Sequence, residues 1–405
     1  MPFRLALSGL NAASTDLTVT ANNVANVATS GFKGSRAEFA DLFATTQQGV
    51  SATAIGNGVR VSNVAQQFSQ GNIDFTDNSL DLAISGQGFF VLNDSGATSY
   101  TRSGAFQVNN QGYVVNAKQQ RLQVYPPLPT GGFNTGGLSD LSLTTGVSSP
   151  NPTTSVDVTL NLPASAAQPA TAIFDPADQT SYNNATSLTV YDSLGAAHTA
   201  SLYFVKGAVA NTWDTRLYVD GTAVGGPQAL AYTTAGALAT PATGQIAFPA
   251  YTPATGAAPI NMTFDFGATT QFGENFSVNA ITQDGFTTGR LIGIDIDSSG
   301  IVQARFTNGR SNALGKIAMT NFSNPQGLQQ LGDTAWAETF ASGQALRGEA
   351  GNSGFGLIQA GALEASNVDI TEQLVNMITA QRNFQANAQM ISTADSITQT
   401  IINIR

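Results

Sequence analysis

The sequence of 405 residues contains no cysteine and only one histidine, His198. The absence of cysteine excludes disulfides, thiolate metal sites and cysteine nucleophiles. A single histidine with no cysteine or second histidine to pair with is a weak candidate for a metal ligand or a general base. Because the turn-forming stretch 192–195 (DSLG) precedes it, we expect His198 at the surface of a hairpin. We therefore expect no metal site, no cofactor and no catalytic residues.

Charge is also scarce, and long apolar runs are missing. Charged residues make up 10% of the chain, and 16 Lys and Arg against 26 Asp and Glu give a net charge of −10. Nucleic-acid binding needs basic side chains to neutralise phosphates, so a nucleic-acid partner is not expected. No apolar run approaches the roughly 20 residues of a membrane-spanning helix. We therefore expect no membrane span.

The N-terminal stretch MPFRLALSGLNAAS is a poor match to a secretory signal peptide, because its apolar run is broken by early polar residues. Taken alone, this favours a cytoplasmic protein. Export without cleavage of a signal stays open as the alternative.

Both ends of the chain have the apolar spacing of helices that pack against other helices. Steps of three and four residues alternate through each end, so we predict helices over 1–28 and 361–405. Their partners are then each other or another subunit. The N-terminal stripe consists of Phe3, Leu7, Leu10, Ser14, Leu17, Ala21 and Val24. The C-terminal stripe consists of Ile370, Leu374, Met377, Gln381, Phe384, Ala388, Ile391, Asp395, Thr398 and Ile402.

Between the two ends, the sequence alternates between short strand patterns and glycine-rich turns. The fold predicted is mainly β with long terminal α-helices, and its discontinuous β domains are nested between coiled-coil-like ends. We expect connectors at 29–59 and 341–360, with a short helix over 37–43 in the first. An inner β domain is expected from 60–147 and 280–340, and an outer inserted β domain from 148–279.

Two chemical interpretations, a calcium site and a glycosidase active site, have less support in the sequence than a structural role for the same residues. Residues 295–300 (DIDSSG) begin like a calcium loop, but Phe306 stands where a bidentate glutamate is needed, which favours a hairpin turn. A β-rich secreted glycosidase would use paired carboxylates. Asp81, Asp192 and Asp265 are available, but none belongs to a recognisable pair.

Several stretches resemble the bacterial flagellar axial proteins, the family of rod and hook subunits. At the two ends and in the first β segment these are 21–33 (ANNVANVATSGFK), 80–90 (LDLAISGQGFF), 365–372 (ASNVDITE) and 382–387 (RNFQAN). Two more, 189–195 (TVYDSLG) and 321–328 (NFSNPQGL), resemble the hook subunits within this family. The resemblance covers nearly the whole chain but has no signature over 205–260.

The resemblance implies a structural subunit that self-assembles into a tubular, flexible joint outside the cell. It implies export through the flagellar type III apparatus without signal cleavage, and no enzymatic activity. The partners implied are further copies of the chain, a rod protein, a cap protein and the proteins at the junction with the filament. A rod protein remains the alternative within the family, although rod subunits are generally shorter and lack the inserted domain.

This hypothesis assigns two sets of residues. The assembly interface is expected to include Leu7, Leu10, Leu17, Asn22, Asn23, Val24, Asn26, Leu374, Met377, Phe384, Ile391 and Ile402. Hinge freedom is expected at Gly31, Gly34, Gly49, Gly56, Gly348 and Gly351 in the connectors.

Overall fold

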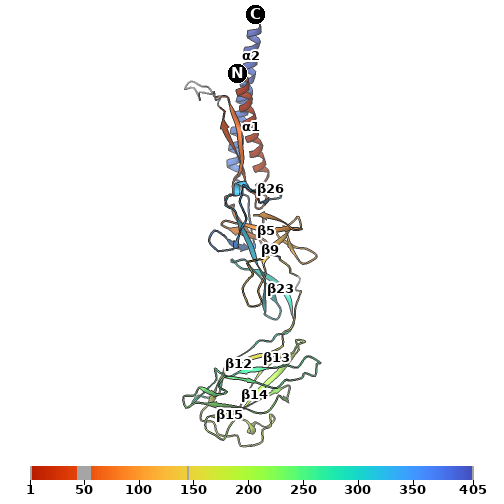
Figure 1. The fold of residues 1–405 in the computed structure, drawn as a ribbon, viewed down its shortest axis with the longest axis vertical. Helices are drawn as coiled ribbons and strands as arrows, with labels where there is room; N and C mark the ends of the chain where they lie inside the picture. Colours follow the sequence, from red (N-terminus) through yellow and green to blue (C-terminus); the bar gives the residue numbers. More distant parts are fainter. Residues whose placement is uncertain (1, 43–55, 144–145, 404–405) are drawn as a thin grey trace. The chain divides into compact units, whose positions relative to one another are not determined.

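The computed structural model describes residues 2–42, 56–143 and 146–403 (Figure 1). It divides into two compact units. Unit 1 comprises Met1–Thr144, Gly293–Arg305 and Ser311–Arg405, and unit 2 comprises Thr145–Ile292 and Phe306–Arg310. Unit 2 is therefore inserted in the sequence of unit 1. The described chain has two α-helices, one near each end, and is otherwise mostly strands, so the predicted fold class is confirmed.

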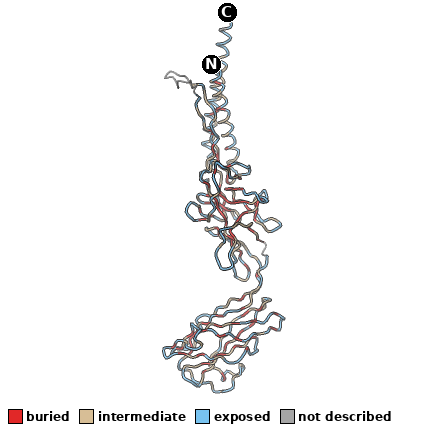
Figure 2. Tube along the Cα trace, in the orientation of Figure 1, coloured by how far each residue is buried: buried red, intermediate tan, exposed pale blue. Residues whose placement is uncertain are grey.

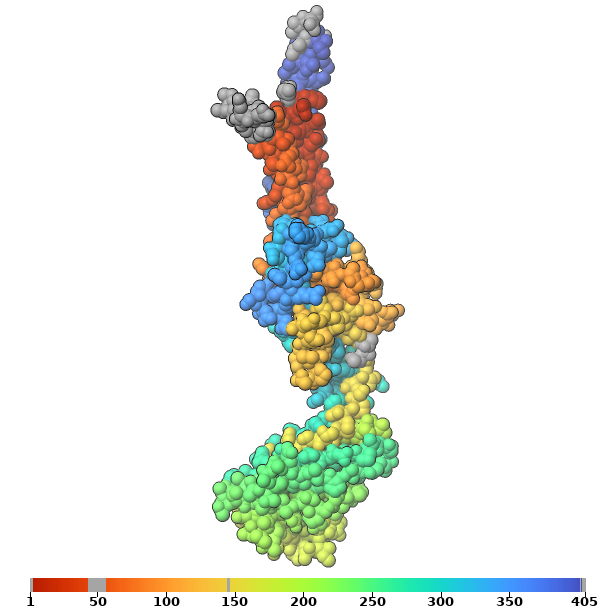
Figure 3. All heavy atoms as spheres, in the orientation of Figure 1, coloured from red at the N-terminus to blue at the C-terminus, as the bar shows by residue number. Residues whose placement is uncertain are grey.

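The two helices of unit 1 run antiparallel along each other. Helix α1 spans Pro2–Ala25, and α2 spans Ile370–Asn403. The Asn23 amide donates to Gln373 Oε1 (3.1 Å), and Gly9 lies against Asn387. Residue numbers thus fall along α1 as they rise along α2, so the part of α2 beyond about residue 394 extends past the start of α1 (Figure 3).

A β-hairpin lies along α1. Strand β1 (Ser35–Asp41) pairs antiparallel with β2 (Val59–Gln66), from Ser35 opposite Gln66 to Asp41 opposite Val59. The predicted helix over 37–43 is wrong where it is described, because residues up to Asp41 form β1. Pairing with β2 and the burial of Ala37 outweigh the local helix propensity of this alanine-containing stretch. Residues 43–55, including Gly49, lie outside the described residues.

The remaining strands of unit 1 form a β domain next to the helices. Its main sheet runs in the order β24-β25-β9-β5-β6-β27-β26, and β4 pairs with β29 while β3 pairs with β30. The bounds are β3 Ile73–Phe75, β4 Leu82–Ser85, β5 Phe89–Asp94, β6 Ala97–Thr101, β7 Gln107–Val108, β8 Val114–Val115, β9 Arg121–Tyr125, β10 Ser139–Asp140, β24 Ile301–Phe306, β25 Ser311–Asn321, β26 Gln329–Gly332, β27 Ala335–Ala337, β28 Leu346–Glu349, β29 Leu357–Ala360 and β30 Ala362–Glu364. The expected connector at 341–360 therefore contains strands β28 and β29.

Unit 2 is a sandwich of two sheets. One has the order β19-β20-β12-β21 with β22 on β12, and the other has the order β13-β14-β15-β17-β18 with β16 on β15. Buried residues alternate along β14 and β15, and they meet the buried residues of β12 and β20 in one core (red in Figure 2). The bounds are β12 Ser155–Pro163, β13 Asn184–Tyr191, β14 Ala197–Lys206, β15 Thr212–Val219, β16 Thr222–Ala223, β17 Gln228–Tyr232, β18 Leu238–Thr240, β19 Gln245–Ala247, β20 Thr263–Asp265, β21 Thr270–Phe272 and β22 Ser277–Gln283. Strands β11 (Val147–Ser148) and β23 (Gly289–Ile296) pair with each other in the sheet that contains β24, and β23 runs from unit 2 into unit 1.

Candidate assembly surface

Helix α1 packs inside the chain through small and polar side chains. The buried residues Ala6, Ala13 and Thr20 recur every seven positions and lie on the same side of the helix as Gly9. A Cβ atom at Gly9 would lie only 2.5 Å from Oδ1 of Asn387. Small residues on this face therefore allow α2 to approach α1 closely.

The N-terminal stripe lies on a different side of α1. Phe3 is 51% exposed and Leu7 is 43% exposed. Leu10, Leu17 and Val24 are half-buried, and Ser14 and Ala21 are exposed. The two ends of the chain therefore do pair, as expected, but the described residues leave much of the predicted apolar stripe uncovered.

The C-terminal stripe is divided between two environments. Met377, Phe384 and Ile391 are half-buried on the side of α2 that also carries the buried Ala380. Leu374 is 46% exposed, and Ile402, beyond the start of α1, is 65% exposed. Further large apolar side chains are exposed on α2 and on the hairpin, namely Ile370, Val375, Ile378, Met390, Ile397, Phe39, Leu42 and Val64.

Large apolar side chains are therefore exposed on both helices and on the adjoining hairpin. Single exposed apolar residues are normal on protein surfaces, whereas extended groups mark interaction sites. We call this set, together with the exposed members of the two stripes, the apolar surface of the helix pair. Its residues suit contact with another protein chain.

A buried ion cluster joins the terminal segments to the β domain. Lys33 Nζ donates to Glu364 Oε1 (2.6 Å) and Arg102 Nη1 donates to Glu364 Oε2 (3.2 Å), with both carboxylate and ammonium fully buried. Lys33 also donates to the carbonyl of Ser69 (2.8 Å), and the amide of Gly71 donates to Glu364 (3.0 Å). Burial lowers the pKa of Lys33, although the Glu364 carboxylate opposes this shift. Sequence analysis missed this cluster because Lys33 and Glu364 are far apart in the chain.

Two asparagines fix the hairpin to the helices. Asn23 is buried, and its amide exchanges two hydrogen bonds with the backbone of Ser35 (2.7 and 2.8 Å) as well as reaching Gln373. Asn367 accepts from the Gly34 amide (2.8 Å) and donates to the carbonyl of Gln67 (2.7 Å). Asn23 was predicted at the assembly interface, but its hydrogen bonds and burial within the chain give it a role in joining the helix and hairpin.

The other two predicted asparagines end helix α1. The side-chain amide of Asn26 donates to the carbonyl of Asn22 (2.9 Å) and to its side-chain oxygen (3.0 Å). The Asn26 carbonyl accepts from the Thr29 amide (3.1 Å) in the turn that follows. Asn22 is exposed and Asn26 is half-buried, so both also remain candidates for contacts with another chain.

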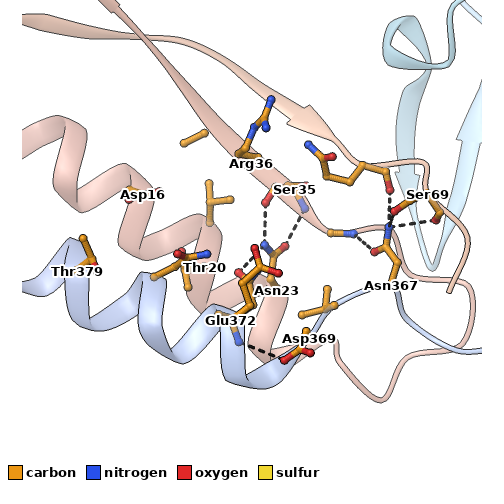
Figure 4. Close-up of a pocket in the computed structure, with 17 residues that line it drawn as sticks. Asp16, Thr20, Asn23, Ser35, Arg36, Ser69, Asn367, Asp369, Glu372 and Thr379 are labelled. Atoms are coloured by element: carbon orange, nitrogen blue, oxygen red, sulfur yellow. Dashed lines mark hydrogen bonds between the residues drawn. The ribbon is translucent and has the colours of Figure 1, made fainter. Parts of the chain in front are cut away.

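A polar groove lies beside Asn23 and Asn367, between α1, the start of α2 and the hairpin (Figure 4). It has a volume of about 440 Å³ and its charged lining residues are Asp16, Arg36, Asp369 and Glu372. Burial raises the pKa of Asp16. Asp369 caps α2 by accepting from the Thr371 amide (2.7 Å). The groove therefore belongs to the polar join between the helices and the hairpin.

Four of the predicted hinge glycines make close packing contacts or backbone hydrogen bonds. Gly31 has φ +71°, and a Cβ there would lie 2.5 Å from the Ser103 nitrogen. Gly34 is buried beside Asn367, Gly348 lies in β28 opposite Met319, and the Gly351 amide donates to the carbonyl of Gly356 (3.1 Å). Gly56 lies just before β2. Hinge motion at these positions stays a prediction.

The chemical alternatives have structural explanations. Asp297 accepts from the amides of Ser299 and Ile301 (both 2.9 Å) and so organises a hairpin turn. Asp81 accepts from Thr76 (2.8 Å) in unit 1, whereas Asp192 and Asp265 belong to unit 2. Among the described residues, no cluster of His, Asp and Glu side chains is arranged to bind a metal ion. The expected surface position of His198 is wrong, because this residue is only 6% exposed and lies between two aspartates.

Comparison with known proteins supports the resemblance along the chain. Sequence profiles match a flagella basal body rod protein at 3–33, the flagellar hook protein FlgE/F/G D1 domain at 83–165, the flagellar basal body protein FlaE D2 domain at 161–286 and the flagellar basal body rod FlgEFG protein C-terminal region at 359–404.

The full-length relatives decide between the rod and the hook. The flagellar hook protein FlgE of Salmonella typhimurium is 39% identical over 417 aligned residues, which cover all of both chains. The chain belongs to the flagellar hook protein family. Hook protein FlgE of Escherichia coli is 38% identical over the whole of both chains, and that of Borreliella burgdorferi is 32% identical over 98% of each.

A solved hook protein has the same fold over most of the chain. The crystal structure of the Helicobacter pylori flagellar hook protein FlgE2 superimposes with a TM-score of 0.54 at 14% identity, covering 72% of this chain and 100% of that one. Membership of the hook protein family makes this chain a structural component of the flagellar hook. No helix in the described ranges is long and apolar enough to cross a membrane.

Proposed function

We propose that the chain polymerises with copies of itself through the apolar surface of the helix pair to build the tubular hook. The observation that supports this most strongly is the exposed N-terminal stripe. Phe3 and Leu7 are about half exposed in a single chain, although their helix already packs against α2 and the hairpin. Burying these side chains between subunits would stabilise the polymer through the hydrophobic effect.

The finer aspects of this role are part of the same proposal. The subunit leaves the cell through the flagellar type III apparatus without signal cleavage, and it contacts rod, cap and filament-junction proteins at the ends of the hook. It has no catalytic activity. The hook bends as a universal joint that transmits torque from rod to filament. The connectors 29–59 and 341–360 act as hinges in this bending. They lie between the helical regions, 1–28 with 361–405, and the two β domains, 60–147 with 280–340 and 148–279.

The proposal is tested by imaging the purified protein after salting out. Ammonium sulfate strengthens apolar association, so we expect tubes or filaments in negative-stain electron micrographs. The matched sample is the same protein without the salt. A protein that remains monomeric over the whole salt range would contradict the proposal.

Removal of the inserted β domain is expected to leave assembly intact. Ser148 of β11 is paired with Gly289 of β23, so the two chain ends left by deleting 149–288 lie side by side and a short Gly-Ser linker can join them. We expect unit 1 to remain folded by circular dichroism and to sediment as polymer. An unfolded product would show that unit 1 depends on the insertion, contrary to the nested organisation.

A further inference from the structure

The one histidine of the chain lies between two carboxylates in unit 2. His198 Nδ1 is 2.6 Å from Asp220 Oδ2, and Nε2 is 3.2 Å from Asp192 Oδ2. His198 is the second residue of β14, Asp192 lies in the turn between β13 and β14, and Asp220 lies in the turn between β15 and β16. The Asp192 carboxylate is fully buried, and that of Asp220 is partly exposed.

This geometry requires a charged imidazole. A neutral imidazole has one N–H group and one bare nitrogen, whereas an ionised carboxylate can only accept hydrogen bonds. With a carboxylate oxygen at each ring nitrogen, both nitrogens must carry a proton. Burial alone lowers the pKa of His198, but hydrogen bonds to Asp220 and Asp192 and their negative charges more than offset it, so the pKa is raised.

Other donors keep both aspartates ionised. Although burial raises the pKa of Asp192, the Thr255 hydroxyl (2.8 Å) and the amides of Ala196 and Leu194 donate to its carboxylate, so its pKa is lowered overall. The pKa of Asp220 is likewise lowered overall: burial raises it, and the opposing contributions come from His198, from the Thr199 amide and from the Tyr251 hydroxyl.

The same aspartates hold a neighbouring segment of unit 2. Tyr251 and Ile260 form an isolated bridge that closes the segment 251–260. Tyr251 donates to Asp220 (3.3 Å) and its ring meets the His198 ring edge-on at 5.8 Å, while Thr255 donates to Asp192. The amide of Ala258 donates to Ser193 Oγ (3.0 Å) in the turn next to Asp192. His198 thus stabilises the two carboxylates to which this segment is attached.

We propose that the His198 imidazolium is a pH-sensitive clasp, which fastens the segment 251–260 to the sandwich of unit 2 and releases it when the proton is lost. The titratable groups that face the ring are Asp192, Asp220 and Tyr251, from three separate segments. Burial and the charge of Asp220 raise the pKa of Tyr251, so this residue stays a donor while His198 titrates. Loss of the imidazolium proton leaves a bare ring nitrogen facing a carboxylate, which repels it.

The direction of the pH effect follows from the raised pKa of the histidine. In the unfolded chain His198 has an ordinary pKa of about 6.5. The stabilisation by the clasp is therefore fully present below that pH and is lost as the pH rises through the higher pKa of the folded state. Alkaline conditions should loosen the segment 251–260, and mildly acidic conditions should keep it fastened.

Imidazole NMR of the full-length monomer tests the protonation directly, because its signals come from one residue. We expect protons on both ring nitrogens at neutral pH and a titration midpoint clearly above that of free histidine. Across this midpoint, hydrogen exchange at the amides of 251–260 should become about tenfold faster than the intrinsic pH dependence of exchange alone would make it, which corresponds to about 1.4 kcal/mol of local stability. Amides in the middle of β14 should keep their protection.

Two variants separate the clasp from general stability. Asp220→Asn should lower the His198 midpoint, and His198→Gln should abolish the step in exchange at 251–260. Asp284→Asn is the matched control, because the Asp284 carboxylate accepts hydrogen bonds from Thr154 and Ser155 elsewhere in unit 2. In this variant the titration midpoint of His198 should equal that of the parent. A parent midpoint at or below that of free histidine, or exchange at 251–260 that does not change across it, would overturn the proposal.

Discussion

Replacing Glu364 by glutamine is expected to lower the free energy of unfolding of unit 1 by about 3–5 kcal/mol, because it leaves two buried cations without their shared counter-charge. The Lys33 and Glu364 side chains are fully buried, and that of Arg102 is 5% exposed, so water cannot take over the missing interaction. The measurement is urea unfolding followed by Trp336 fluorescence. A Trp213→Phe background removes the signal of unit 2 from every sample.

The matched control is an ion pair in the same unit that remains in contact with water. Arg36 and Glu38 are 3.1 Å apart, with side chains 68% and 41% exposed. Glu38→Gln should therefore change stability by no more than about 1 kcal/mol. If Glu364→Gln and Glu38→Gln lower the free energy of unfolding by similar amounts, the buried cluster does not stabilise the attachment of the terminal segments to the β domain as its geometry indicates.

The expected effect follows from which segments the cluster joins. Lys33 follows helix α1, Arg102 follows β6, and Glu364 ends β30 shortly before α2. Gly31 adds a backbone hydrogen bond from its amide to the Glu364 carbonyl (2.7 Å). Both helices are therefore attached to the β domain at one point.

The terminal helices could be predicted from the sequence because their apolar spacing is a local property. Steps of three and four residues over 24 and 34 residues leave little choice of secondary structure. The β1 hairpin could not be predicted in the same way. Residues around Ala37 have a weak local preference, and pairing with β2, more than twenty residues later, decides their conformation.

The functional residues also divide into those that a local sequence pattern predicts and those that depend on contacts made only in the folded chain. The stripe of Phe3, Leu7 and Leu10 was visible as a pattern, but which side of α1 would meet α2 was not, because the contact uses Gly9, Ala13 and similar small residues. His198 was predicted at the surface because its neighbours in sequence form a turn. Its burial depends on Asp220 and Tyr251, which only the folded sandwich brings to the ring.

A charge in the N-terminal stripe is expected to weaken polymerisation strongly without affecting the folded monomer. Leu7→Asp is the cleanest change, because Leu7 is 43% exposed in one chain, whereas Phe384 and Leu17 are half-buried and also contribute to packing within unit 1. The loss of apolar burial between subunits, together with the cost of burying a carboxylate there, is about 3 kcal/mol. This corresponds to an increase of roughly 100-fold in the critical concentration for assembly.

Sedimentation of the salted-out protein measures the critical concentration, and a thermal melt of the monomer measures its stability. Thr18→Asp adds the same charge to α1 at an exposed position outside the stripe, so its critical concentration should stay close to that of the parent. The free energy of unfolding of each monomeric variant should lie within about 0.5 kcal/mol of the parent's, as is usual for surface substitutions. Polymer formed by Leu7→Asp at the parental concentration would exclude the stripe from the subunit contact. Equal losses in both variants would mean that assembly responds to the added charge on α1, whether or not it falls in the stripe.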